Sequence, residues 1–105
     1  MPQYAVLQSH PPDNCPLTNR AVREFAKKVY ADAPNLAQQL GVNVLVDIHL
    51  DPGHRAFTLF EAPSAEAVRD YLVRGGFAHF LDLQFHLVTP LQELVQHMDD
   101  LPTLY

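Results

Sequence analysis

Apolar and polar residues alternate along the chain with two different periods, which indicates both strands and helices. An alternation of about two residues is typical of strands, and recurrence at three and four residues is typical of amphipathic helices. Val22, Phe25 and Val29 begin the longest helical stripe. The predicted elements are a strand at 3–9, a helix from about 20 to 40, strands at 42–50 and 55–62, a helix at 65–74, a strand at 83–88 and a short helix at 91–98.

Several residues predict where these elements begin and end. Thr18 or Asn19 is a suitable N-cap for the first helix, and Ser64 is one for the second. Pro34 predicts a kink or a short restart within the first helix, and Gly41 predicts its end.

The last helix and the second strand carry further signals. Thr89 followed by Pro90 predicts a capped start of the closing helix. In the strand at 42–50, the alternation places Val44, Val46 and Ile48 on one face.

The order of elements predicts an α+β fold, the ferredoxin-like βαββαβ sandwich with a short C-terminal helix. Right-handed crossovers set the sheet order as fourth, first, third and second strand, all antiparallel. The 105 residues fit a single domain over residues 1–105, long enough to bury a core without disulfides.

Two short motifs occur at loops of this topology. Residues 9–16 read Ser-His-Pro-Pro-Asp-Asn-Cys-Pro after the first strand, and residues 52–54 read Pro-Gly-His in the central hairpin. With Glu-Ala-Pro-Ser-Ala-Glu-Ala-Val at 61–68, the chain resembles an uncharacterised bacterial family of the dimeric α+β-barrel superfamily, through about Leu94. The resemblance implies a dimeric α+β barrel but no particular reaction. Related groups include nickel-binding proteins, cofactor-free monooxygenases, isomerases and haem enzymes.

Charge and composition exclude several partners. The chain has 7 Lys and Arg against 12 Asp and Glu, and its net charge is −5. Nucleic-acid binders normally carry a basic patch, so no nucleic-acid partner is expected. No apolar run approaches the roughly 18 residues that cross a bilayer, and the first residues do not resemble a signal peptide, so no membrane partner is expected. A single cysteine fits a reducing, cytoplasmic location, and the lack of glycine-rich phosphate motifs predicts no nucleotide cofactor.

The strands carry apolar residues on both faces. Val6 and Leu7 are neighbours on opposite faces, as are Leu59 and Phe60. Two helices cover one face, and the short closing helix cannot cover four strands. Burial of the second face predicts a homodimer in which another copy packs against it. The alternative is a monomer whose C-terminal tail folds over that face.

Histidine and cysteine supply the candidate chemistry. The topology gathers five such residues at one end of the sheet, and these are His10, Cys15, His49, His54 and His79. Imidazole and thiolate bind divalent transition metals such as nickel, zinc or copper. His10, Cys15 and His54 form the predicted centre, because a proline-stiffened loop holds the first two and the hairpin brings the third. His49 or His79 would supply a fourth ligand, or water would.

Other interpretations of these residues remain open. Scattered histidines are often only solvated, and Cys15 is either a small buried hydrophobe or a thiol activated near a helix N-terminus. A small enzyme could instead use a pocket on the sheet, with Asp47, His49, Thr58 and His86 as polar groups and Tyr4 and Phe60 as walls. The sequence therefore predicts a small cytoplasmic transition-metal-binding protein, with a cofactor-free, haem-type or cysteine-based enzyme as the alternative.

Overall fold

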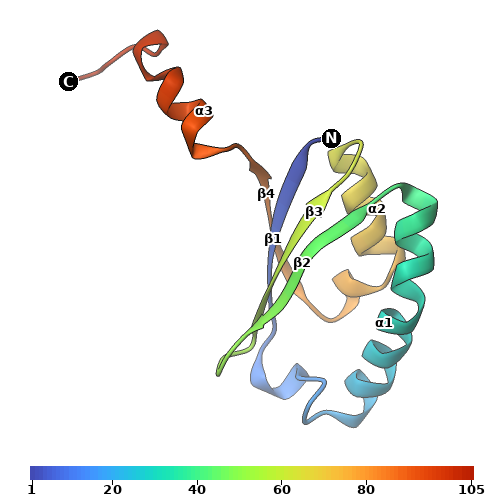
Figure 1. Cartoon of the computed structure of the whole chain (residues 1–105). Coiled ribbons are helices and arrows are strands. Elements are labelled where there is room, and N and C mark those ends of the chain that lie inside the picture. Colours follow the sequence, from blue (N-terminus) through green and yellow to red (C-terminus); the bar gives the residue numbers. More distant parts are fainter.

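The computed structural model describes residues 1–105 and has the predicted order of elements (Figure 1). Its four strands form one antiparallel sheet in the order β2-β3-β1-β4. The predicted α+β, ferredoxin-like βαββαβ fold and its sheet order are confirmed. No helix combines the length and the apolar character needed to cross a bilayer. The elements are β1 (Gln3–Ser9), α1 (Arg20–Leu40), β2 (Asn43–Leu50), β3 (Arg55–Glu61), α2 (Ala65–Arg74), β4 (Asp82–Val88) and α3 (Leu91–Gln96), with short 3₁₀ turns at Pro12–Asn14, Phe77–His79 and Met98–Asp100.

Side-chain caps fix where the two long helices begin. Asn19 Oδ1 accepts a hydrogen bond from the Val22 amide at 3.1 Å, and Ser64 Oγ accepts one from the Ala67 amide at 3.2 Å. Each cap satisfies a backbone donor that has no partner within the helix. Gly41 ends α1 with a φ of 71°, a left-handed conformation that glycine adopts without a steric penalty.

α1 continues through Pro34 as one element, so the helix does not restart there. Proline removes one helical hydrogen bond. Ala33 and Ala37, on either side of it, are both buried in the core. Packing of that face holds the helix together across the proline, because tertiary contacts supply most of a helix's stability.

β2 differs from the predicted alternation. Its register on β3 shifts between Val44 and Val46, because Leu45 is an additional residue that forms a β-bulge. Val44 lies opposite Phe60, whereas Val46 lies opposite Leu59 on the other face. The prediction that Val44 and Val46 share a face is therefore wrong, since a period-two pattern does not reveal an inserted residue.

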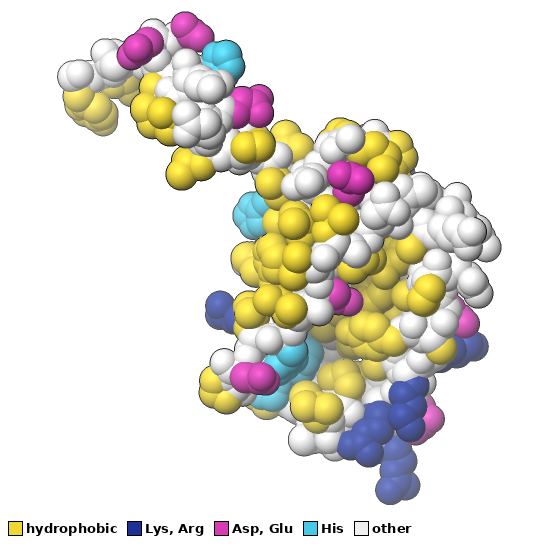
Figure 2. All heavy atoms as spheres, viewed as in Figure 1, with side chains coloured by type: hydrophobic (Ala, Val, Ile, Leu, Met, Phe, Trp, Pro, Cys, Tyr) yellow, Lys and Arg dark blue, Asp and Glu magenta, His cyan; other side chains and the backbone are white.

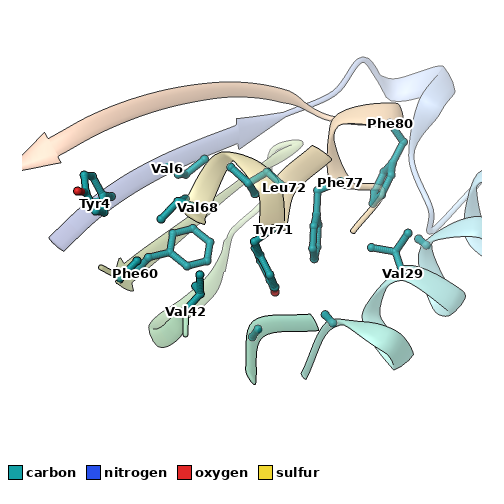
Figure 3. Close-up of a cluster of buried hydrophobic side chains, with 14 residues drawn as sticks. Tyr4, Val6, Val29, Val42, Phe60, Val68, Tyr71, Leu72, Phe77 and Phe80 are labelled. Carbon is teal, nitrogen blue, oxygen red and sulfur yellow. The ribbon is translucent and has the colours of Figure 1, made fainter. Parts of the chain in front are cut away.

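The core lies between the sheet and the two long helices (Figure 3). The side chains of Val6, Phe60 and Val68 are fully buried there and come from β1, β3 and α2. Burial of one such side chain contributes about 1.5–3 kcal/mol to folding. These contacts join the central strands to α2 and fix which face of the sheet the helices cover.

The opposite face of the sheet carries no helix (Figure 1). α3 begins after Pro90 without a side-chain cap, so the predicted cap at Thr89 is wrong. α3 and the residues after it extend away from the end of β4 and do not fold over the sheet.

Gly76→Ala tests the tight turn between α2 and β4. Gly76 has a φ of 92°, and a Cβ atom there would lie 2.9 Å from Cγ2 of Val29 and 3.2 Å from Cζ of Phe25. The left-handed backbone costs other residues about 1–2 kcal/mol, and the overlap adds to this cost. We expect the free energy of unfolding to fall by about 2–4 kcal/mol, measured by urea denaturation.

Gly53→Ala is the matched control. A Cβ atom at Gly53 would meet nothing closer than the Leu50 carbonyl oxygen at 3.9 Å. Its free energy of unfolding should change by less than about 0.5 kcal/mol. Similar losses in the two variants would contradict the role assigned to Gly76.

Candidate metal centre

The register of β1 on β3 brings two predicted ligands together. The two strands pair as far as Ser9 opposite Arg55. One step further, the His10 amide donates a hydrogen bond to the His54 carbonyl at 3.2 Å. The two imidazole rings consequently lie edge to face, with centroids 5.1 Å apart.

The loop between β1 and α1 delivers the third ligand, Cys15. The Asn14 side-chain amide donates to the Phe80 carbonyl at 3.1 Å, which ties the loop to the turn before β4. The Asn19 side-chain amide donates to the Asp13 carbonyl at 3.0 Å and closes the loop on itself. Cys15 is only 4% exposed, so its thiol is held in the wall of the site.

His10, Cys15 and His54 form a group in which one ligand atom of each residue lies within 4.8 Å of the others. In a tetrahedral zinc site, bonds of about 2.1 Å to nitrogen and 2.3 Å to sulfur place neighbouring ligand atoms roughly 3.5 Å apart. If side-chain rotations move these ligand atoms by about 1 Å, all three atoms come within bonding distance of one ion. The group can hold a metal.

The local hydrogen bonding of His10 favours coordination. Its Nδ1 lies 3.0 Å from the Pro11 carbonyl oxygen. A carbonyl oxygen only accepts, so Nδ1 carries the proton and donates, and Nε2 of the neutral ring keeps its lone pair. Metal-binding histidines in proteins commonly use their second ring nitrogen in this way, which fixes the tautomer and the ring orientation.

The group opens into a cavity of about 370 Å³. His49 lines this cavity too, although it lies outside the group of three. Its Nδ1 is 2.6 Å from Oδ1 of Asp51, and both side chains are exposed. Histidine side chains gather at this end of the molecule, beside the β2–β3 turn (Figure 2). The other lining residues include Gln8, Leu17, Tyr30, Arg55 and Phe80.

His79, His86 and His97 are not brought to this group. The His79 ring packs edge to face on Phe25, with centroids 5.6 Å apart, in a separate hollow. His86 lies opposite Ala5, on the sheet face away from the helices, so the predicted pocket of Asp47, His49, Thr58 and His86 does not form. His97 lies in the C-terminal segment, where its Nδ1 is 3.2 Å from Oδ2 of Asp100.

Two linked hydrogen bonds beside the group of His10, Cys15 and His54 were not predicted from the sequence. The buried Gln8 side chain donates to Thr58 Oγ1 at 2.7 Å, and Thr58 donates to Asp47 Oδ1 at 2.9 Å. Asp47 lines a second cavity of about 520 Å³ together with Tyr30 and Tyr71. The sequence did indicate that Gln8 is unusual, because the alternation in β1 places this polar residue on the same face as Tyr4 and Val6. These two hydrogen bonds provide partners for the buried polar atoms of Gln8 and Thr58, and they link the walls of both cavities.

The two tyrosines of the second cavity hold their protons more strongly than usual. Burial raises the pKa of Tyr71 to about 12, and the nearby Asp47 carboxylate and Tyr30 add to the shift. Burial also raises the pKa of Tyr30, with Asp47 as the second cause. Both causes disfavour a phenolate, so these side chains are neutral hydrogen-bonding groups over the physiological range.

Comparison with known proteins supports the fold. No protein-family model matches the chain, and no curated protein matches it. A solved structure of a REP-associated tyrosine transposase bound to a REP hairpin is similar, with a TM-score of 0.50 at 6% sequence identity. The match covers 93% of this chain but only 62% of the transposase chain. At this identity the likeness shows the arrangement of strands and helices alone.

Asp47→Asn tests the placement of this carboxylate by alkaline titration. The folded-state pKa of Tyr71 lies at about 12, above its ordinary value of 10.0, so folding is stabilised below pH 10 and that stability is lost as the pH rises towards 12. Without the carboxylate, we expect a lower Tyr71 pKa that stays above 10.0, because burial remains the larger cause. Phenolate absorbance measured against pH reports the change.

Asp51→Asn is the matched control, since Asp51 does not contribute to either tyrosine shift. Its phenolate titration should superimpose on that of the parent protein. An unchanged titration in Asp47→Asn would mean that Asp47 does not face the tyrosines in solution.

Proposed function

We propose that the chain is a small transition-metal-binding protein whose ion is held by His10, Cys15 and His54. The observation that carries this function is the convergence of three ligand-type side chains from three places in the sequence within 4.8 Å. They come from the end of β1, from the following loop and from the β2–β3 turn. The register of β1 on β3 aligns His10 with His54, but it does not require ligand-type side chains there or a cysteine beside them, and a shared ligand explains this choice of residues.

The donor set favours nickel, zinc or copper. Two imidazoles and a thiolate suit these borderline or soft ions, whereas magnesium and calcium select oxygen ligands. The buried position of Cys15 also favours a ligand over an exposed reactive thiol. Protons compete with the metal for the imidazoles and the thiolate, so affinity falls as the pH drops below neutrality.

Three protein ligands leave one tetrahedral position for water or a small ligand, which is the usual arrangement of catalytic zinc sites. His10, Cys15 and His54 all line the cavity of about 370 Å³, so a small ligand in that cavity would reach an ion that they held. His49 and Asp51 line the same cavity as a hydrogen-bonded pair, 2.6 Å apart. This pair favours a metal-dependent small enzyme as the second candidate function, with His49 as the proton-accepting group.

Substitution of the ligands tests the metal site. His10→Ala, Cys15→Ser and His54→Ala should each lower the affinity for Zn²⁺ or Ni²⁺ at least tenfold, because each removes one of three bonds to the ion. The parent protein should bind one ion per chain and melt at a higher temperature when loaded. Calorimetric titration and elemental analysis measure affinity and stoichiometry.

His79→Ala is the control, since His79 lies in the separate hollow against Phe25. It should bind the metal as the parent does. An unchanged affinity for Zn²⁺ in Cys15→Ser would refute Cys15 as a ligand.

Cobalt(II) tests the open position. In the cobalt-loaded protein, azide should shift the visible absorption spectrum, because it enters the coordination position that the three protein ligands leave open. His49→Ala should retain one cobalt ion per chain, since His49 lies outside the group of three ligands. A spectrum that does not respond to azide would show a closed site and exclude the enzyme candidate.

A further inference from the structure

The end of the chain forms an arm that touches little of its own body. Every residue from 89 to 105 is exposed, and these residues are called the C-terminal arm below. The radius of gyration of the chain is 16.4 Å, whereas a compact chain of this length has about 13 Å. The arm accounts for the difference, because it projects beyond the end of β4 (Figure 1).

The arm carries an apolar row that nothing in its own chain covers. Leu91, Leu94 and Val95 follow a three- and four-residue spacing, which places them on one side of α3, and Met98 follows in the 3₁₀ turn after it. Leu94 is 52% exposed and Met98 is 59% exposed. Hydrophobic side chains are visible along the arm in Figure 2. Isolated helices shorter than about 12–15 residues are marginal in water, so the six residues of α3 need a surface to pack against.

The sheet offers such a surface on the side without helices, called the outer face below. Leu7 and Ile48 both lie opposite Phe57, and Val46 lies opposite Leu59. These positions alternate with the buried Thr58 and Phe60 and therefore point away from α1 and α2. The apolar part of the outer face consists of Leu7, Val46, Ile48, Leu50, Phe57 and Leu59, of which the first four are exposed.

The junction of β4 with the arm keeps the arm from folding back onto its own outer face. Pro90 has a φ of −56° and a ψ of 132°, so the chain continues extended at this point. The proline ring fixes its own φ, and it disfavours the helical region for Thr89 before it. A sharp reversal onto the same sheet would have to bend these two residues. The arm instead leaves on the side of the outer face (Figure 1), where another molecule can receive it.

A second copy of the chain satisfies both surfaces at once. We propose that two copies exchange their C-terminal arms, so that the apolar row of each arm packs on the outer face of the other copy. The partner's arm then covers the apolar part of the outer face, which lies on β1, β2 and β3, so that a sheet that is apolar on both sides is buried on both. The seventeen residues of the arm and the six apolar side chains of the outer face fall within the 20–30 residues that a standard interface takes from each partner. The homodimer expected from the strand pattern packs a second copy against the sheet, and the exchange differs from it in that the partner's arm is what contacts the outer face.

Matched lysine substitutions test both halves of the contact in the full chain. Leu94→Lys on the arm and Ile48→Lys on the outer face should each convert a dimer of the 11.8 kDa chain into a monomer at micromolar concentration. Ile48 is 49% exposed on an edge strand, where lysine is well tolerated, so the fold should survive. Sedimentation equilibrium measures the mass, and circular dichroism checks the fold.

Two controls carry the same change elsewhere. Gln92→Lys lies on α3 outside the apolar row, and Val73→Lys lies at an apolar groove between α2 and β4 that is the competing receptor for the arm. Both should remain dimeric. Three results would overturn the proposal. The parent protein could be a monomer, or the dimer could survive Leu94→Lys. The dimer could also be lost in Val73→Lys but kept in Ile48→Lys.

Crosslinking distinguishes exchange from an arm folded on its own sheet. A Leu94→Cys chain is mixed with an Ile48→Cys chain that carries a tag, so that the two chains differ in length. The mixture is treated with a flexible bismaleimide. The parent protein, whose one cysteine is Cys15, gives the background level of crosslinking. Exchange predicts a linked product that contains one chain of each kind. A double variant, with Leu94→Cys and Ile48→Cys in one chain, tests the folded-back arm. If it forms links only within single chains, the arm folds on its own sheet and the exchange is refuted.

Discussion

The antiparallel register of β1 on β3 is the constraint on which the rest of the molecule depends. It sets Tyr4 opposite Phe60 and Val6 opposite Thr58 on the helix-covered face. Because the side-chain period of a strand is two, a slip of one residue would move these side chains to the outer face. The same register ends with Ser9 opposite Arg55, and the next step aligns His10 with His54. The core and the candidate metal centre are therefore consequences of one pairing, and the burial of Val6 and Phe60 stabilises both.

The loop that follows β1 contributes rigidity to the site. Arg23 on the first turn of α1 donates hydrogen bonds to the carbonyls of Pro16 and Leu17, at 3.0 and 2.6 Å. Asn14 and Asn19 add the two contacts that tie the loop to Phe80 and to Asp13. Proline already limits the conformations of this segment in the unfolded chain, so less entropy is lost when the loop is ordered. A loop held in this way would lose little conformational entropy if Cys15 bound an ion, which favours tight binding.

The order of elements, the helix ends, the sheet order and the group of three candidate ligands could all be predicted from the sequence. The order of elements followed from their periods, and Asn19, Ser64 and Gly41 identified helix ends correctly because capping is a local interaction. The sheet order followed from crossover handedness. The grouping of His10, Cys15 and His54 followed from placing strand ends on that topology. In each case, residues close in sequence or a general rule of chain connection carried the information.

What the sequence did not predict depends on contacts between distant segments. The bulge at Leu45 reverses which face Val44 uses, and only the pairing with Phe60 and Leu59 reveals it. His79 was placed at the correct end of the sheet, but its ring packs on Phe25 in a hollow of its own. Thr89 had the composition of a cap, yet α3 begins at Leu91 without a side-chain cap. The hydrogen bonds from Gln8 to Thr58 and from Thr58 to Asp47 join three strands, so they could be recognised only once the register of those strands was known.

The candidate metal centre and the C-terminal arm lie at opposite ends of the sheet. β4 ends with Val88 opposite Gln3, at the beginning of β1, whereas His10 follows the last residue of β1. The seven residues of β1, at about 3.3 Å each, separate the two ends by about 23 Å. All three ligands belong to one chain, so the centre is complete in a single copy. Association through the arm would bury the outer face and leave the centre and its cavity intact, because His10, Cys15 and His54 take no part in that face. The candidate metal centre and the proposed arm exchange would thus be separate properties of the same sheet, the first set by the end of a strand and the second by its uncovered side.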